Sequence, residues 1–585
     1  MINESKPGMA VRRRTRSRGR RGAARTRRFY TQLVLAVLFA TLASAGVFGK
    51  ALDQETMAET APSPIPSLNA GVVINPTAQA PETLEPSPSN TPLADFAVQT
   101  AIALESATPA PTQPEFIDIQ PTAIPTGFPP ENTPTPTPKP AGTPAPPVLY
   151  YTQPGDTLPI LAIRFGVSIQ EIQGPDAKPV TPDPTLLKPG QLLIIPNRLN
   201  PDTLTSEKQL IPDSEVVFSP SAADFNIDAY VKQAGGYLST YRQYLGSTEW
   251  TSGSDIIKRV ALDNSINPRI LLALLEYKAH WVFGQPQNLA ETFYPLGVLD
   301  RERRDLYAQL NWAVDNLSIG YYSWRQGRLT AFTFPDGTSI RTDPRLNAGT
   351  VAIQYLFSLQ ENMREWGGDL YNRESFPATY EKMFGNPWII AQSVEPLLPA
   401  TLAQPHMELP FMPGQVWAFT GGPHGAWNHE GAWAALDFAP GSSESGCVQT
   451  NAWATAVATG LVVRSTHGVV VLDLDGDGRE ETGWDVLYLH IADAGRVPEG
   501  TWVEAGGIIG HPSCEGGIAT GTHVHIARKY NGEWILADGP LPFNLSGWIA
   551  HEGKHIYEGT LTKDGKTVAA CPCSSGETFI MRPKP

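Results

Sequence analysis

Two histidines in the C-terminal part of the chain are separated by a single residue. They lie in the segment 517–528, which reads GIATGTHVHIAR and carries His523 and His525. Successive side chains of a β-strand point to opposite faces, so both imidazoles project from one face and Val524 projects from the other. Such a pair either places a metal ligand beside a catalytic base or forms two half-buried sheet histidines.

The surrounding sequence favours chemistry over a structural pair. Ten of the eleven histidines lie from His406 onward, in a region of short apolar segments separated by glycine-rich turns. This regular strand and turn spacing predicts an antiparallel sheet. The expected strands are 415–420, 432–438, 456–463, 468–473, 485–490 and 507–510.

Polar residues recur at four places along these strands. They are His424, Asp437, His490 and the pair His523 and His525, in that order along the chain. This order, with its TGTHVH context, resembles the M23 family of zinc metallopeptidases, also called LytM or lysostaphin-like. The 13-residue step from His424 to Asp437 resembles the β-lytic branch of that family. The resemblance covers residues 405–550 and implies an enzyme that cuts peptides of bacterial cell walls.

The resemblance also implies roles for these side chains. His424, Asp437 and His525 are expected to bind one Zn²⁺, leaving a fourth position for water. His490 and His523 are then expected to be catalytic, because they can orient that water, move its proton and stabilise the oxyanion. His429 is the alternative to His424 as the first ligand.

The N-terminal quarter differs in composition from the rest. Residues 1–28 are strongly basic and precede the apolar run 29–48, which reads as a signal peptide or a membrane anchor. The remainder is therefore expected to be exported to the cell envelope or beyond. Residues 49–147 are rich in Pro and Thr and are expected to be a disordered linker. The net charge of -14 argues against a nucleic-acid partner.

Residues 148–198 form a compact predicted unit with a β-α-α-β order. Gly155, Asp156 and Thr157 open the first helix, which Asp156 or Thr157 can cap, and the sequence KPGQLLIIP closes the unit. These motifs resemble a LysM domain, a module that binds glycans containing N-acetylglucosamine. The resemblance implies that residues 155–157 contribute to glycan binding.

Residues 215–395 read mainly as helices, including 254–262 and 268–276. The latter starts at Pro268, which suits a first helical turn. It ends at Glu276 and resembles the helix that carries the catalytic glutamate of lysozyme-like transglycosylases. Glu276 is thus either a possible second catalytic site acting on glycosidic bonds or a capping group. Residues 551–585 form a C-terminal extension.

Four cysteines are consistent with export, because disulfides persist in oxidising compartments. They allow three pairings; we expect Cys447 to pair with Cys514, and we leave Cys571 and Cys573 open. Between two predicted strands, Asp473, Asp475 and Asp477 form either an Asp- and Gly-rich hairpin turn or a calcium-binding loop.

The sequence therefore predicts a multidomain cell-wall hydrolase. A zinc endopeptidase would cleave peptide stems or cross-bridges of peptidoglycan, a LysM module would raise its local concentration, and residues 29–48 would contact the membrane. The alternatives are a non-catalytic envelope-binding or regulatory protein, and a glycosidase acting through the helical region. The bond that is cleaved is not fixed by these motifs.

Overall fold

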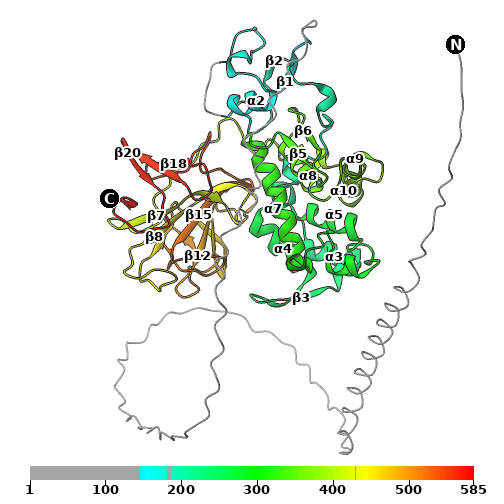
Figure 1. The fold of residues 1–585 in the computed structure, drawn as a ribbon. Coiled ribbons are helices and arrows are strands. Elements are labelled where there is room, and N and C mark those ends of the chain that lie inside the picture. Colours follow the sequence, from blue (N-terminus) through cyan, green and yellow to red (C-terminus); the bar gives the residue numbers. More distant parts are fainter. Residues whose placement is uncertain (1–144, 181–185, 429, 585) are drawn as a thin grey trace, which may run out of the picture. The chain divides into compact units, whose positions relative to one another are not determined.

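The structure is a computed structural model that describes residues 145–180, 186–428 and 430–584. These residues belong to one compact unit, shown as a ribbon in Figure 1. The predicted basic segment, apolar run and linker lie outside the described residues. Within the described ranges, no helix combines the length and the apolar composition needed to cross a bilayer.

The predicted LysM-like unit has two strands around one α-helix. Its elements are β1 (Val148–Tyr151), α2 (Leu158–Phe165), the 3₁₀-helix η1 (Ile169–Glu171) and β2 (Leu192–Ile195). The strands pair antiparallel with Val148 opposite Ile195, and Leu161 and Phe165 of α2 pack beneath them. The expected second short helix is η1, which begins after Ser168, but the expected cap was wrong, because no side chain caps the start of α2. The carboxylate of Asp156 instead accepts hydrogen bonds from Tyr150 and Arg164.

The middle region is mostly helical, as predicted. Its helices are α3 (Ile227–Ala234), α4 (Gly253–Asn264), α5 (Pro268–Ala279), α6 (Leu289–Phe293), α7 (Leu306–Arg325), α8 (Ala348–Ser358), α9 (Met363–Tyr371), α10 (Phe376–Phe384) and α11 (Pro387–Ala391). Short 3₁₀-helices are η2 (Pro201–Thr203), η3 (Asp213–Glu215), η4 (Pro220–Ala222), η5 (Tyr237–Ser239) and η6 (Arg301–Arg303). Two hairpins complete it, β3 (Arg242–Leu245) with β4 (Glu249–Ser252), and β5 (Ala331–Thr333) with β6 (Ser339–Arg341).

Local sequence explains where the two predicted helices begin. The Ser252 side chain accepts the backbone N–H of Asp255 at the start of α4, and the Asn267 side chain accepts that of Arg269 at the start of α5. Both are N-cap hydrogen bonds that satisfy an otherwise unpaired donor of the first turn. Pro268 occupies the first position of α5, as expected.

The C-terminal region is built on antiparallel strands, as predicted. They are β7 (Val416–Gly425), β8 (Trp433–Pro440), β9 (Ala454–Thr455), β10 (Gly460–Thr466), β11 (Gly468–Asp473), β12 (Trp484–Ile491), β13 (Trp502–Val503), β14 (Ile508–Gly510), β15 (Val524–Tyr530), β16 (Glu533–Trp534), β17 (Asn544–Leu545), β18 (Trp548–Glu552), β19 (Gly559–Lys563), β20 (Lys566–Ala569) and β21 (Phe579–Met581). The main sheet has the order β13-β10-β11-β12-β15-β8-β7-β21, with β16 beside β15. The expected strand 456–463 was wrong in part, because residues 456–459 are not in a strand and β10 begins at Gly460.

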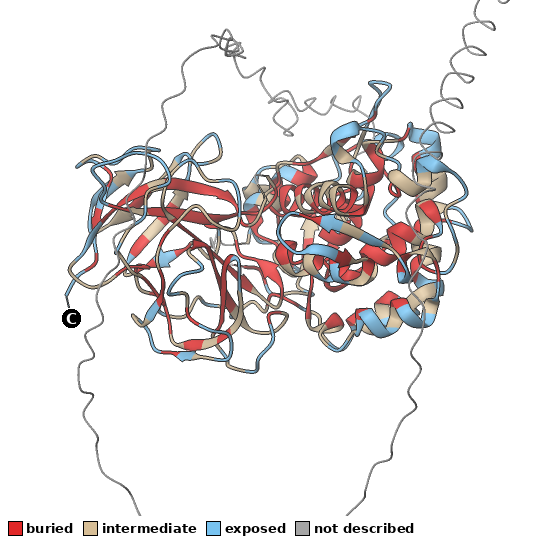
Figure 2. Ribbon diagram, turned by 90° about the horizontal axis from the view of Figure 1, so that it is seen from below, coloured by how far each residue is buried: buried red, intermediate tan, exposed pale blue. Residues whose placement is uncertain are grey.

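The two faces of the main sheet have different partners. One face, carrying Leu472, Val486 and Ile526, packs into a hydrophobic core within the C-terminal region. On the other face, residues such as Leu487 and Ala527 belong to the same hydrophobic cluster as the buried residues of α4, α5 and α7. Figure 2 shows the resulting runs of buried residues along the sheet and the helices. The alternation of the strands therefore gives the sheet two buried faces.

Two covalent bonds join segments of the C-terminal region. The predicted disulfide between Cys447 and Cys514 is present, and it connects the loop after β8 to the loop before β15. Cys571 and Cys573, whose pairing the sequence left open, are bonded to each other.

A buried arginine ties the three regions together. Arg325, at the end of α7, forms ion pairs with Asp213 at 2.9 Å and with Glu533 at 3.0 Å. It also donates a hydrogen bond to the carbonyl of Pro154 in the LysM-like unit. The side chain is only 8% exposed, so its charge depends on these carboxylates for compensation.

Replacing this arginine tests how tightly the regions are coupled. Arg325→Met leaves two buried carboxylates without their cation, so we expect the free energy of unfolding to fall by about 3–5 kcal/mol. Urea unfolding of the full chain, followed by tryptophan fluorescence, measures the change. The control is Arg301→Met at an exposed position. Equal stabilities of the two variants would contradict the role assigned to Arg325.

Candidate functional site

The His-x-His pair lies where the alternation predicts. His525 is the second residue of β15 and His523 directly precedes that strand, while Val524 and Ile526 are fully buried in the core on the other side. Asp437 of β8 is the register partner of His525. Directly opposite residues of an antiparallel pair project from the same face, so β8 and β15 place the carboxylate beside the imidazole.

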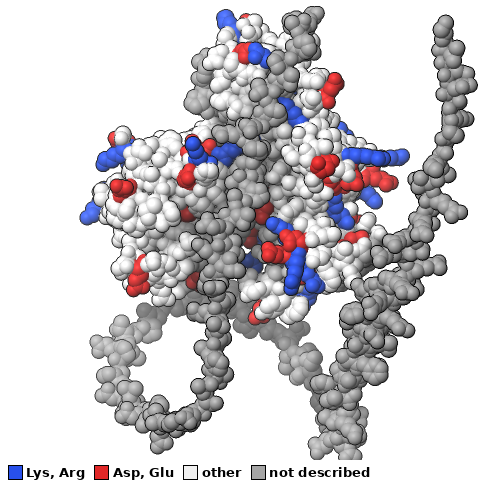
Figure 3. Space-filling view, viewed as in Figure 1, with Lys and Arg blue, Asp and Glu red and all other residues white. Residues whose placement is uncertain are grey.

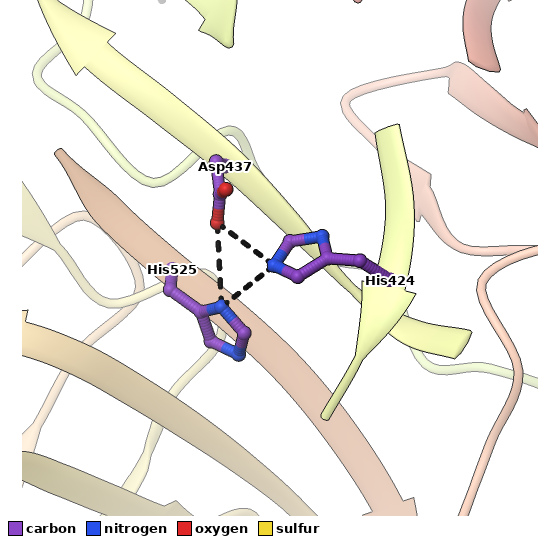
Figure 4. Close-up of side chains that lie close together, drawn as sticks. All are labelled: His424, Asp437 and His525. Atoms are coloured by element: carbon purple, nitrogen blue, oxygen red, sulfur yellow. Dashed lines mark hydrogen bonds and ion pairs between the residues drawn. The ribbon is translucent and has the colours of Figure 1, made fainter. Parts of the chain in front are cut away.

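Three side chains meet at this point, as shown in Figure 4. His424 Nε2 lies 3.0 Å from His525 Nδ1 and 3.3 Å from Asp437 Oδ1, and His525 Nδ1 lies 3.3 Å from the same oxygen. All three residues are buried, and their ligand atoms form one of the groups that can hold a metal ion. The structure thus brings together the three residues that the resemblance predicted as zinc ligands.

The second nitrogen of each imidazole is fixed by a backbone carbonyl. His424 Nδ1 lies 2.8 Å from the carbonyl oxygen of Gly422, and His525 Nε2 lies 2.9 Å from that of Ala426. A carbonyl can only accept, so these nitrogens carry the hydrogen, and a lone pair is left on the nitrogens that face Asp437. Burial lowers the pKa of His525, although Asp437 opposes this, and a lowered pKa favours the neutral ring that a metal requires.

The surroundings of Asp437 favour a nearby cation. Its Oδ1 atom is buried and has no hydrogen-bond partner among the described residues. Burial acts to raise the pKa of this carboxyl, but His424 and His523 outweigh it and hold the pKa well below its usual range. The group is therefore an ionised carboxylate with one oxygen directed at two imidazole nitrogens.

These distances fit a tetrahedral zinc ion. Bonds of about 2.0 Å to nitrogen and oxygen give tetrahedral edges of ~3.3 Å, close to the three observed separations. Two neutral imidazoles and a carboxylate are also a ligand set that zinc accepts in catalytic sites. The residues present therefore fit the metal.

Two glycines before His424 let the strand approach its neighbours. A Cβ atom on Gly421 would lie 2.4 Å from Asp437 Oδ2, and one on Gly422 would lie 2.5 Å from the carbonyl oxygen of Glu558. Strand β7 runs through these glycines to Gly425, with shifts of register. The glycines are needed for the close approach of the backbone rather than for a turn.

His490 and His523 lie beside the three ligands. Their rings are 4.5 Å apart between centroids, and His523 Nε2 is 3.7 Å from Asp437 Oδ1. His490 Nδ1 is 2.9 Å from the carbonyl of Glu515, so Nε2 carries the lone pair of the neutral ring. Burial, with the neighbouring His523 and His525, lowers the pKa of His490 to about 3. The ring of His490 is therefore neutral at neutral pH, with the lone pair on Nε2.

Sequence reasoning missed Tyr557, which belongs to the predicted C-terminal extension. Its ring stacks on that of His424, with 4.2 Å between the centroids. The peptide N–H of Gly422 donates to the carbonyl of Tyr557 at 2.8 Å, which holds the two segments together. Burial raises the pKa of this phenol to about 12, and Asp437 acts in the same direction, so the hydroxyl stays protonated. No spacing motif in the sequence links residue 557 to the histidines.

The other predicted site residues lie elsewhere. Glu276 accepts the backbone N–H groups of Val282 and Phe283, each at 3.0 Å, which is the contact of a group that holds a loop. Asp156 and Thr157 are buried, and Arg325 packs so closely on Gly155 that a Cβ there would lie 2.3 Å from Nη1. These positions give the 155–157 loop a structural role here, and glycan binding by it stays a prediction.

Two further predictions concern single positions. His429, the alternative first ligand, lies outside the described residues. Asp473, Asp475 and Asp477 lie in the hairpin between β11 and β12, which confirms the expected turn, and their oxygen atoms gather as a second group that can hold a metal ion.

The surface in Figure 3 carries charges of both signs. On the face shown, acidic and basic side chains lie among each other.

Comparison with known proteins finds relatives of the helical region and of a larger part of the chain. Residues 209–398 match the family described as "LasA, N-terminal domain". The chain is 27% identical over 355 residues to Protease LasA of Pseudomonas aeruginosa, covering 56% of this chain and 75% of that protein. Over this span the chain is similar to Protease LasA. The curated relatives are proteases, which agrees with the metalloendopeptidase predicted from the sequence.

Solved structures of peptidases are also similar. The M23 metalloprotease pseudoalterin, from the deep sea, is 22% identical and covers 29% of this chain and 96% of its own, with a TM-score of 0.25. The catalytic domain of lysostaphin from Staphylococcus simulans is 22% identical and covers 21% of this chain and 87% of its own, with a TM-score of 0.15.

The close approach at Gly421 gives a direct test of the predicted ligands. Gly421→Ala pushes a methyl group against Asp437, so we expect zinc affinity to fall by about 10–100-fold, as when groups that orient a ligand are lost. Competition with a chromophoric chelator measures the dissociation constant. Gly441→Ala is the matched control, since nothing lies within 4 Å of its Cβ position. Unchanged affinity in Gly421→Ala would remove Asp437 from the ligand set.

Proposed function

We propose that this protein is a cell-wall hydrolase, a zinc-dependent endopeptidase that cleaves peptide stems or cross-bridges of peptidoglycan. The observation that carries the proposal is the triangle of His424, Asp437 and His525, with two more imidazoles beside it. Its similarity to Protease LasA supports a peptidase, and the named activity of lysostaphin as an antimicrobial peptidase is consistent with a bacterial wall as substrate.

Zinc bound by these three residues supplies a Lewis acid and a water molecule whose pKa is lowered toward about 7. The neutral ring of His490 is placed to accept a proton at Nε2, because Nδ1 is held by the carbonyl of Glu515. His523 directs Nε2 to the same side, because its Nδ1 is held by the carbonyl of Gly521 at 2.8 Å. The two rings can thus orient the attacking group and stabilise developing negative charge.

The other parts of the proposal concern delivery of the enzyme. Export through residues 29–48, as a cleaved leader or as an anchor, would bring the chain to the envelope. Binding of the LysM-like unit to wall glycan that contains N-acetylglucosamine would raise the effective concentration of the peptide substrate. The helical region is proposed as a supporting domain, since Glu276 is engaged with the backbone of the loop after α5.

Product analysis tests the reaction class. We expect the full chain to release new amino groups from purified peptidoglycan, without new reducing ends, and to stop doing so when a zinc chelator is added. His525→Ala should give the same loss, because it removes one of the three metal ligands. New reducing ends would instead assign the activity to the helical region, and wall binding without either product would identify a binding protein.

A substitution at His490 separates catalysis from metal binding. We expect His490→Ala to lower kcat by about 10²–10⁴-fold, the range for loss of a general acid or base, while the zinc content stays at one per chain. Peptide hydrolysis and metal analysis of the same preparation give both numbers. His511→Ala is the control, because that ring stacks on Trp453 away from the ligands. Full activity in His490→Ala would contradict the proposed role.

A further inference from the structure

The hairpin loop between β11 and β12 has the spacing of a cation-binding loop. Asp473, Asp475 and Asp477 alternate along it and are followed by Gly478, whose φ is +85°. One oxygen of each carboxylate lies within 4.8 Å of the others. Calcium loops take ligands from positions 1, 3 and 5 and need glycine at position 6 for a sharp turn. Acidic turns of this kind also occur without an ion, so the spacing alone decides nothing.

A buried carboxylate beneath the loop supplies an independent observation. Asp485 is completely buried, and neither of its carboxylate oxygens has a hydrogen-bond partner among the described residues. It is the register partner of Asp473 across β11 and β12. Since Leu472 and Val486 fill the core on one face, Asp473 and Asp485 project together from the other, at the base of the loop. An ionised carboxylate in this position is costly unless a cation lies near it, and burial accordingly raises the pKa of Asp485 well above its usual range.

The neighbouring basic side chains do not supply that cation. Lys529 lies 3.1 Å from Glu480, and Arg464 lies 2.7 Å from Glu480 and 2.6 Å from Asp263. In the part of the chain that the structure describes, no Lys, Arg or His nitrogen lies within 4.0 Å of the carboxylates of residues 473, 475, 477 or 485. The carboxylates of Asp473, Asp475 and Asp477 thus lie close together without an ion pair to a described basic side chain. Lys529 is the register partner of Asp485 and acts to lower the pKa of Asp485, but burial outweighs it.

We propose that this hairpin loop binds one calcium ion, with the carboxylates of Asp473, Asp475 and Asp477 as ligands and Asp485 as the buried counter-charge beneath them. Calcium takes six to eight oxygen ligands in flexible geometry, and loop carbonyls and water complete that number. Magnesium demands a more regular octahedron and keeps its water, so it fits a crowded, irregular set of carboxylates less well. The site is separate from the predicted zinc ligands and does not rest on the proposed function.

The consequence of binding is a stiffer hairpin. Strand β12 runs from this loop to His490, and Arg479 of the loop pairs with Asp224 of the helical region at 2.8 Å. A bound cation relieves the mutual repulsion of the three loop carboxylates next to the start of β12. Calcium is therefore expected to raise the unfolding temperature of the chain, because the ion binds the folded hairpin and not the unfolded one.

Equilibrium dialysis with radioactive calcium tests the site directly. The zinc-loaded full chain is first freed of calcium and then dialysed against radioactive calcium with magnesium present. It is expected to bind one calcium ion with a dissociation constant of about 10⁻⁴–10⁻³ M, the range of extracellular modules. Asp475→Asn and Asp477→Asn should each weaken binding at least tenfold. Both positions are exposed, so the variants are expected to fold. Asp564→Asn, in the exposed hairpin turn between β19 and β20, should bind like the unchanged chain.

A zinc-site variant keeps this test apart from the proposed function. His525→Ala should bind calcium normally, because its ring is not part of the loop. The proposal would be overturned if no saturable binding were found up to about 10⁻² M calcium, a concentration well above the dissociation constants of the weakest extracellular sites. Binding that survives both loop substitutions, or binding that is lost only in His525→Ala, would overturn it as well.

Discussion

The alternation of side chains along β15 is the constraint on which the rest of the structure depends. Val524 and Ile526 must point into the core of the C-terminal region, and this forces His525 to the opposite face. The register with β8 then places Asp437 directly beside it. A slip of one residue in β15 would turn His525 into the core. A slip of one residue in β8 would turn Asp437 away from the histidine.

The face that carries the ligands is also the face on which the helices pack. Leu487 and Ala527 share a hydrophobic cluster with buried residues of α4, α5 and α7, so this face of the sheet is not simply open to water. Arg325 and its two carboxylate partners fix the same interface by charge. His490 is also buried, and burial is the main cause of its lowered pKa.

Most of the site could be predicted because the order and context of its residues resemble the M23 family, and that resemblance singled out His424, Asp437 and His525. The strand period of two then explains why β8 and β15 place Asp437 beside His525. Tyr557 could not be predicted, because it reaches His424 through a backbone contact with Gly422 that no local pattern encodes. The cap predicted for α2 was wrong for a similar reason, since the carboxylate of Asp156 accepts hydrogen bonds from Tyr150 and Arg164 instead.

The central claim is that His424, Asp437 and His525 form a catalytic zinc site. Zinc K-edge X-ray absorption of the zinc-loaded full chain tests it most directly. The account predicts four light ligands at about 2.0–2.2 Å, with the multiple-scattering signature of two imidazoles. A sulfur shell at about 2.3 Å, or a spectrum without imidazole scattering, would contradict it.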